Sequence, residues 1–195
     1  MNVAFPGLTR AAEGLSRRRF TVSDVEAMVE AGIMDESERV ELIGGELVPM
    51  SPKGARHELV KVALNRRWTR AAPSDCGVAQ QTTFRLSPDT YLEPDFVIYP
   101  EAAGLLAISA ENVLLVVEIA DSSKRYDTGR NARLYASFGV RELWVIDAVK
   151  LTMRVFRAPS ATGYGEIQDY SAIATVAPAF APEAFALKLK DLQLK

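Results

Sequence analysis

The 195-residue sequence contains one cysteine and one histidine. Cys76 has no second cysteine with which to form an intrachain disulfide, and a single histidine with a single cysteine cannot make a structural zinc site. The longest apolar run, Val113 to Val117, is far shorter than the roughly 20 residues of a membrane-spanning helix. The N-terminus lacks the charged-then-apolar pattern of a signal peptide. We therefore expect a cytoplasmic protein with no membrane partner, whose metal ligands, if any, are carboxylates.

The sequence also lacks a surplus of charge of either sign. Its 23 Lys and Arg stand against 25 Asp and Glu, a net charge of −2, so nucleic acid would have to bind to a local basic surface. Hydrophobic residues make up 48% of the chain, which is typical of a globular domain that can bury a substantial core. We expect a flexible N-terminal arm over residues 1–19 and a single domain over residues 20–195.

Local patterns predict two helices and a hairpin in the first half of that domain. Capping residues around Thr21 and Asp24 precede an amphipathic pattern that ends at Gly32. Two short apolar segments flank Gly44-Gly45, a pair suited to a tight hairpin turn. A second helix is expected after residues 51–54, with one apolar face formed by His57, Val60, Leu64 and Trp68.

The second half is predicted to contain mostly strands. The segment 113–119 is apolar on both faces, as expected for the middle of a sheet. A helix at 127–138, between that strand and a strand at 141–147, predicts a right-handed crossover that joins two parallel strands. We also expect strands at 78–86, 95–99, 151–156 and 166–170, and a loop at 176–186 that covers a sheet edge.

Acidic residues within these strands are the first candidates for a functional site. Asp95 opens one strand and Glu118 lies near the end of another, so an antiparallel arrangement would bring the two carboxylates together. Glu41, inside the hairpin, is a third candidate. Converging carboxylates form an oxygen-ligand site for Mg²⁺ or Mn²⁺, which can polarise a phosphodiester and activate water. Alternatively, each carboxylate forms an ion pair with one of the arginines.

The order of these residues resembles the PD-(D/E)XK nuclease superfamily and, more closely, the bacterial Uma-two family of endonucleases. The resemblance covers nearly the whole chain, and no single motif in it is specific. The matching segments are Phe20-Thr21, residues 38–47, Met50-Ser51-Pro52, His57, Pro94-Asp95, residues 117–119, Ser122-Ser123, Tyr126-Asp127, Tyr135, Gly139-Val140 and residues 142–147. The resemblance implies an α/β restriction-endonuclease-like fold, with a central mixed β-sheet flanked by helices.

The resemblance also implies a function and a site. It implies an endonuclease that hydrolyses nucleic-acid phosphodiesters, with DNA as the expected substrate and Mg²⁺ or Mn²⁺ as the cofactor. Asp95 and Glu118 correspond to metal ligands, and Glu41 to a third acidic member. His57 also matches the family pattern, and either acts near the scissile phosphate or the metal, or has only a structural role.

The sequence departs from the family at its lysine. Position 120, two residues after Glu118, is alanine, and the usual family position four residues after Asp127 is Asn131. Helical spacing places Asn131 on the apolar face that is directed at the sheet. Three explanations are open. Lys124 or Arg130 replaces the charge of the lysine, Asn131 positions water by hydrogen bonding, or catalysis is lost. The asparagine can also be an engineered replacement.

These alternatives leave two functions open. The first is an endonuclease whose catalytic residues are Glu41, His57, Asp95, Glu118, Lys124 and Asn131. The second is a catalytically silent binding or assembly module that retains the nuclease fold. A basic cluster at Lys124, Arg125, Arg130 and Arg133 is the expected phosphate-binding surface. The strand near 166–170 is a candidate edge for a homodimer.

Overall fold

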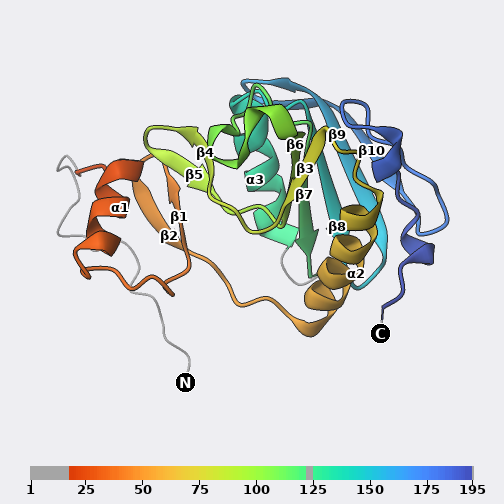
Figure 1. The fold of residues 1–195 in the computed structure, drawn as a ribbon, viewed down its shortest axis with the longest axis horizontal. Coiled ribbons are helices and arrows are strands. Elements are labelled where there is room, and N and C mark those ends of the chain that lie inside the picture. The colour runs from red at the N-terminus through yellow and green to blue at the C-terminus, as the bar shows by residue number, and fades with distance from the viewer. Residues whose placement is uncertain (1–17, 122–124, 195) are drawn as a thin grey trace.

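The fold was analysed in a computed structural model, which describes residues 18–121 and 125–194 (Figure 1). The predicted arm lies almost entirely outside the described residues, as does Lys124. The α-helices are α1 (Val22–Glu30), α2 (Ala55–Ala71) and α3 (Arg125–Ser137). The strands are β1 (Val40–Ile43), β2 (Glu46–Pro49), β3 (Cys76–Ala79), β4 (Phe84–Ser87), β5 (Thr90–Leu92), β6 (Phe96–Pro100), β7 (Leu115–Ala120), β8 (Glu142–Asp147), β9 (Thr152–Ser160) and β10 (Gly163–Tyr170). Short 3₁₀ helices are η2 (Glu101–Ala103), η3 (Leu105–Ala107), η5 (Glu183–Phe185) and η6 (Leu189–Asp191).

A mixed six-stranded sheet in the order β10-β9-β8-β7-β6-β3 forms the centre of the molecule. Strands β7 and β8 are parallel, with α3 as the crossover between them, and the other neighbouring pairs are antiparallel. The predicted unit of two parallel strands joined by a helix is therefore confirmed, and the antiparallel arrangement on which the meeting of Asp95 and Glu118 depended is present. The result is an α/β fold with a central mixed sheet.

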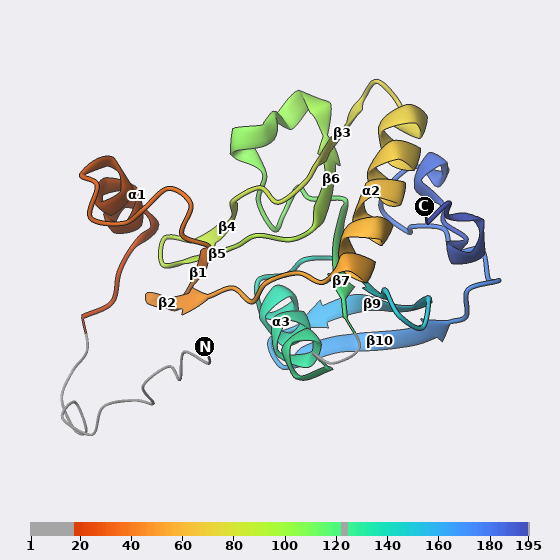
Figure 2. The ribbon, with the colours of Figure 1, turned by 90° about the horizontal axis from the view of Figure 1, so that it is seen from below.

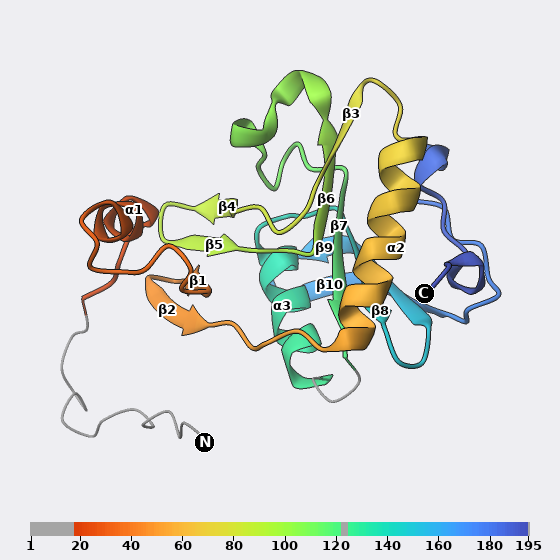
Figure 3. The same cartoon turned by 60° about the horizontal axis from the view of Figure 1, so that its bottom comes forward.

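Helices cover both faces of this sheet (Figures 2 and 3). On one face, α2 contributes the buried Leu64 and Trp68, which pack with Phe96, Trp144 and Phe185. On the other face, α3 buries its apolar residues, among them Ala132, Tyr135 and Ala136, against β7, β8 and β9. Because alternate side chains of a strand point to opposite faces, the apolar central strands supply both cores.

A smaller sheet in the order β2-β1-β5-β4 lies beside the large one, at the end of the molecule that also carries α1 (Figure 1). The predicted hairpin forms here, with positive φ angles of 57° at Gly44 and 80° at Gly45. The expected capping box also forms, because Thr21 and Asp24 exchange side-chain-to-backbone hydrogen bonds at the start of α1. The buried residues of α1 pack against β1 and against Tyr91 of β5.

Two of the expected elements differ from the structure. The strand predicted at 78–86 is two strands in different sheets, since Gln81 adopts a positive φ of 48° and the chain then turns from β3 to β4. The loop at 176–186 covers a face of the large sheet rather than an edge, and buries Phe185 against Trp68 at a ring separation of 6.3 Å. The short strand β5 was not predicted. In the described part of the chain, no helix is long and apolar enough to cross a membrane.

Candidate metal and phosphodiester site

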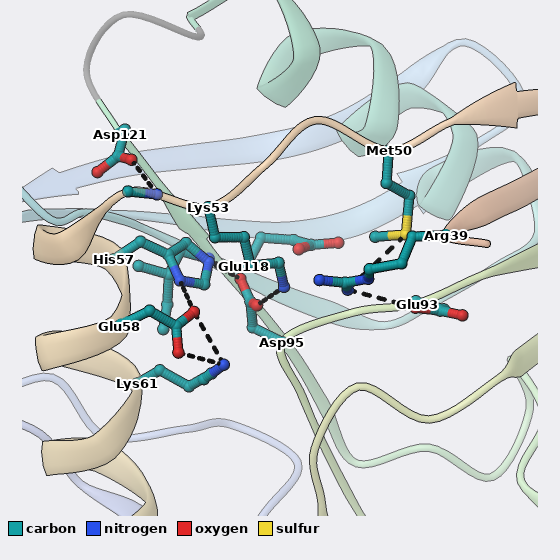
Figure 4. Close-up of polar contacts among 12 residues, drawn as sticks. Arg39, Met50, Lys53, His57, Glu58, Lys61, Glu93, Asp95, Glu118 and Asp121 are labelled. Carbon is teal, nitrogen blue, oxygen red and sulfur yellow. Dashed lines mark hydrogen bonds and ion pairs between the residues drawn. The ribbon is translucent and has the colours of Figure 1, made fainter. Parts of the chain in front are cut away.

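Asp95 lies at the centre of the candidate site, immediately before β6, and its residue surface is only 2% exposed. Its Oδ2 accepts the backbone N–H of Ile119 at 2.8 Å and lies 2.9 Å from His57 Nε2. Its Oδ1 forms an ion pair with Lys53 Nζ (Figure 4). A buried carboxylate is stable only with such partners, and here strand β7, helix α2 and the segment before α2 each supply one.

Glu118 lies beside Asp95 because β6 and β7 run antiparallel, with Phe96 opposite Val117. Its Oε1 accepts a hydrogen bond of 2.7 Å from the hydroxyl of Tyr135 on α3. The structure therefore brings together the two carboxylates that the sequence singled out, one from each strand.

Glu41 joins them from the smaller sheet, although it is distant in sequence from both. Its Oε1 accepts the backbone N–H of Glu93 at 3.3 Å. Glu41, Asp95 and Glu118 line one cavity of about 240 Å³, together with Lys53, His57 and Asn131. The cavity lies where the two sheets meet.

Two further carboxylates line the cavity, and each has a partner elsewhere. Glu93 pairs with Arg39 at 3.4 Å. Asp121 accepts the backbone N–H of Gly54 at 3.1 Å. The cavity is therefore lined by five carboxylates in all, of which Glu41, Asp95 and Glu118 are those expected from the sequence.

The three carboxylates differ in how well nearby positive charge stabilises their ionised forms. For Asp95, burial acts to raise the pKa, but the His57 hydrogen bond and the Lys53 ammonium outweigh it and hold the pKa below its usual value. Burial and the adjacent Asp95 charge raise the pKa of Glu118 well above its usual range. Burial also raises the pKa of Glu41. Glu118 and Glu41 therefore lack the positive charge that balances Asp95.

A divalent cation would supply that missing charge, and the chemistry of the donor set fits one. The donors are carboxylate oxygens, which hard cations such as Mg²⁺ and Mn²⁺ prefer. Asp95 uses three of the roughly four acceptor positions of a carboxylate, so Oδ1 retains one beside Lys53. Within residues 18–121 and 125–194, however, no three His, Cys, Asp or Glu side chains are grouped closely enough to enclose a metal ion as they stand.

His57 holds Asp95 in place from the first turn of α2. The residue is 4% exposed, and its other ring nitrogen, Nδ1, lies 3.2 Å from Glu58 Oε1. Lys61 in turn pairs with Glu58 at 2.6 Å. The sequence left a phosphate-contacting role and a structural role open for His57, and its direct contact is with the Asp95 carboxylate.

Asn131 also lies where its helical spacing predicted. It projects from α3 to the wall of the cavity, next to the exposed Arg130. Both residues line the cavity that contains Glu118. The other residue proposed to replace the family lysine, Lys124, is outside the described residues.

Lys53 is the residue that the sequence analysis missed. It follows Met50-Ser51-Pro52, a segment matched only as part of the family pattern, and no periodicity directs its side chain anywhere. Its neighbour Gly54 packs so tightly on Asp121 that a Cβ there would lie 2.4 Å from Oδ2. A glycine between a lysine and a helix start was the available signal, because close backbone approach is one reason for glycine at such a place.

Comparison with known proteins agrees with this fold. The Uma2 family, described as "Putative restriction endonuclease", matches residues 23–190. A crystal structure of a "putative nuclease belonging to DUF820" from Anabaena variabilis ATCC 29413 matches with a TM-score of 0.62 and 17% identity, over 88% of this chain and 96% of that chain. No curated protein matches the chain. The chain therefore belongs to the Uma2 family and has a restriction-endonuclease-like α/β fold.

Proposed function

We propose that this protein is a Mg²⁺- or Mn²⁺-dependent endonuclease that hydrolyses DNA phosphodiester bonds. The observation that carries the proposal is the convergence of Glu41, Asp95 and Glu118 on one cavity from strands of two sheets. Membership of a nuclease family supports the same reaction class. Rigid strands suit such a site, because catalytic geometry has to be maintained within fractions of an ångström.

Asp95 and Glu118 would hold the cation, and Glu41 would assist from the facing sheet. Once bound, the cation would polarise the scissile phosphate and make the attacking water more acidic. His57 orients Asp95 through the 2.9 Å contact, and Tyr135 orients Glu118 through its 2.7 Å hydrogen bond. These two contacts fix the rotamers of both proposed ligands before a metal arrives.

DNA would approach along α3, on the side where the exposed Arg130 and Arg133 lie. With a net charge of −2, the protein would depend on such local cations to contact phosphates. We therefore expect binding to weaken steeply with added salt, because each neutralised phosphate releases counterions. An affinity that is the same at 50 and 200 mM salt would argue against this surface.

A second function, a silent binding module with the nuclease fold, is favoured by a single observation. Asn131 is neutral and shorter than the lysine usual at this place in the family, so α3 brings no lysine charge to the cavity at that position. The two functions differ in whether the chain as it stands cuts DNA.

The test is the nicking of supercoiled plasmid in low salt with Mn²⁺ or Mg²⁺. The parent protein is expected to nick the plasmid, and Asp95→Asn to abolish nicking while the protein stays folded. Asp35→Asn, at an exposed carboxylate in the turn after α1, is the matched control and is expected to cut like the parent. A parent that binds plasmid but never cuts, with either metal, would establish the binding module instead.

Metal binding is the independent readout for the same site. Millimolar Mn²⁺ is expected to raise the melting temperature of the parent, since a ligand at 100 times its Kd stabilises the native state by about 2.7 kcal/mol. Asp95→Asn is expected to remove most of this rise, and Asp35→Asn none of it. Equal shifts in all three proteins would place the metal elsewhere.

A further inference from the structure

Lys53, from the segment before α2, contacts the acidic centre directly. Its ammonium pairs with Asp95 Oδ1, and its side chain is only 14% exposed. It lines the same cavity as Glu41, Asp95 and Glu118. One half-enclosed lysine is therefore placed among the three carboxylates of the site.

The described arginines nearby are placed differently. Arg130 lines the cavity but is exposed. Arg39 is engaged with Glu93. Position 131, where the family usually has lysine, carries a neutral side chain.

The backbone around Lys53 is fixed by contacts that depend on its sequence. Gly54 forms the N-cap of α2 and donates its N–H to Asp121, which follows directly after β7. The glycine allows this close approach, because a Cβ would overlap the Asp121 carboxylate. The contact attaches the segment that carries Lys53 to the end of the strand that carries Glu118, so the lysine is positioned by the sheet itself.

We infer that Lys53 is a catalytic residue, which supplies from the segment before α2 the positive charge that the family's lysine would supply from position 131. The inference rests on the proposed function and adds to it the group that stabilises the transition state. It also answers the question raised by Asn131. The lysine that α3 lacks is replaced by a lysine that enters the cavity from the segment before α2.

The step that Lys53 assists is the hydrolysis of a phosphodiester. The water oxygen forms a bond with phosphorus, and the bond between phosphorus and the leaving sugar oxygen breaks with its electron pair. One water proton passes to solvent, and the leaving oxygen takes a proton from solvent, so atoms and charge balance. Lys53 neither gives nor takes a proton in this step, and its side chain would face the non-bridging oxygens where negative charge increases. Its unbranched stem lets the ammonium turn from Asp95 Oδ1 towards the phosphate.

The test compares Lys53→Met with Lys188→Met in the full chain with Mn²⁺. Lys188 is the control because it is also half-buried, but it immediately precedes η6 and is not among the residues that line the cavity. Loss of a preorganised transition-state contact is typically worth about 10²–10³ in kcat. We expect that loss in Lys53→Met with KM nearly unchanged, and parental kinetics in Lys188→Met.

A lysine placed at position 131 on α3 tests whether cleavage depends on a positive charge in the cavity or only on the stability of the fold. In Lys53→Met/Asn131→Lys, a lysine again reaches the cavity, now from α3, and cleavage is expected to recover at least tenfold over Lys53→Met. Mn²⁺ is expected to raise the melting temperature of Lys53→Met at least as much as that of the parent, because the carboxylates remain and a competing cation is gone. A purely structural lysine would not give the recovery of cleavage, and the Mn²⁺ shift shows that the carboxylate site is intact in Lys53→Met.

The inference and the proposed function fail in different ways. Parental cleavage by Lys53→Met overturns the role of Lys53 and leaves the nuclease function in place. A parent that cuts only after Asn131→Lys overturns both, because the chain as it stands is then the silent module. If neither the parent nor Asn131→Lys cuts DNA with any metal, and Mn²⁺ shifts no melting temperature, both are overturned.

Discussion

At the scale of single residues, the ionised form of Glu118 is destabilised by two neighbouring carboxylates. Lys53 offsets only part of this repulsion. Asp95 and Glu41 act on Glu118 across the cavity, and one hydrogen bond from Tyr135 stabilises it. Buried like charges destabilise a fold in the absence of a cation, and strongly perturbed groups of this kind are concentrated at functional sites. The repulsion within the proposed metal site therefore lowers the stability of the metal-free protein.

We predict that Glu118→Gln stabilises the metal-free protein by on the order of 1 kcal/mol, because it removes the charge and keeps an acceptor for Tyr135. The melting temperature should rise by about 2–4 °C in metal-free buffer at neutral pH. Burial and repulsion raise the pKa of Glu118, so its destabilising effect is complete above that pKa and disappears as the pH falls below the usual carboxyl range. The difference should accordingly shrink in acid. Glu111→Gln, at an exposed position, should change nothing, and a lower melting temperature for Glu118→Gln would refute the prediction.

At the scale of elements, the start of α2 decides how the site is assembled. The helix begins at Gly54, which has an ordinary φ of −82° and no side-chain cap. Asp121, directly after β7, accepts the backbone N–H of Gly54 itself. The helix start, the lysine before it and the histidine in its first turn are thereby brought to the carboxylates by one tertiary contact.

We predict that Gly54→Ala destabilises the protein by about 1–3 kcal/mol, the usual effect of overpacking, because its Cβ would lie 2.4 Å from Asp121 Oδ2. Gly129→Ala is the matched control. Gly129 lies in α3 with no atom within 4 Å of the added Cβ, and replacing a helical glycine by alanine stabilises by roughly 0.5–1 kcal/mol. Thermal melting should thus give shifts of opposite sign. Parental stability of Gly54→Ala would mean that the helix start moves freely.

At the scale of the whole molecule, the C-terminal segment (residues 176–194) packs against the large sheet that supports the site. It buries Phe185 and Leu187 in the α2 core. Glu142, at the start of β8 and only 1% exposed, holds this segment by hydrogen bonds. Its Oε2 accepts the backbone N–H of Ala179 at 2.7 Å, and its Oε1 accepts a hydrogen bond from Arg157 at 2.6 Å.

We predict that Glu142→Ala destabilises the whole protein by about 3–5 kcal/mol, because it leaves a guanidinium and a backbone N–H without their acceptor. Denaturant unfolding measures this change. The control is Glu166→Ala, whose residue lies directly opposite Arg157 on β10 but is exposed, and which should change stability by less than 1 kcal/mol. Similar effects of the two substitutions would show that the segment is not held by Glu142.

Much of the fold could be predicted because its signals are local. The capping box of Thr21 and Asp24, the Gly44-Gly45 turn and the apolar run of β7 each act within a few residues. The break between β3 and β4 could not be predicted, since it depends on which sheet each half joins. The same distinction applies to the site. The three carboxylates were found as charges within strands, whereas Lys53 has no local pattern.

Local sequence patterns are enough to predict the helix starts, the hairpin, the central strands and the carboxylates that could hold a metal. Short-range hydrogen bonding and side-chain periodicity are sufficient for each of these. The meeting of Glu41 with Asp95 and Glu118 across two sheets, and the entry of Lys53 into the same cavity, depend on how the elements pack in three dimensions. The energy of a buried charge depends on every group around it in space, whatever their separation along the chain.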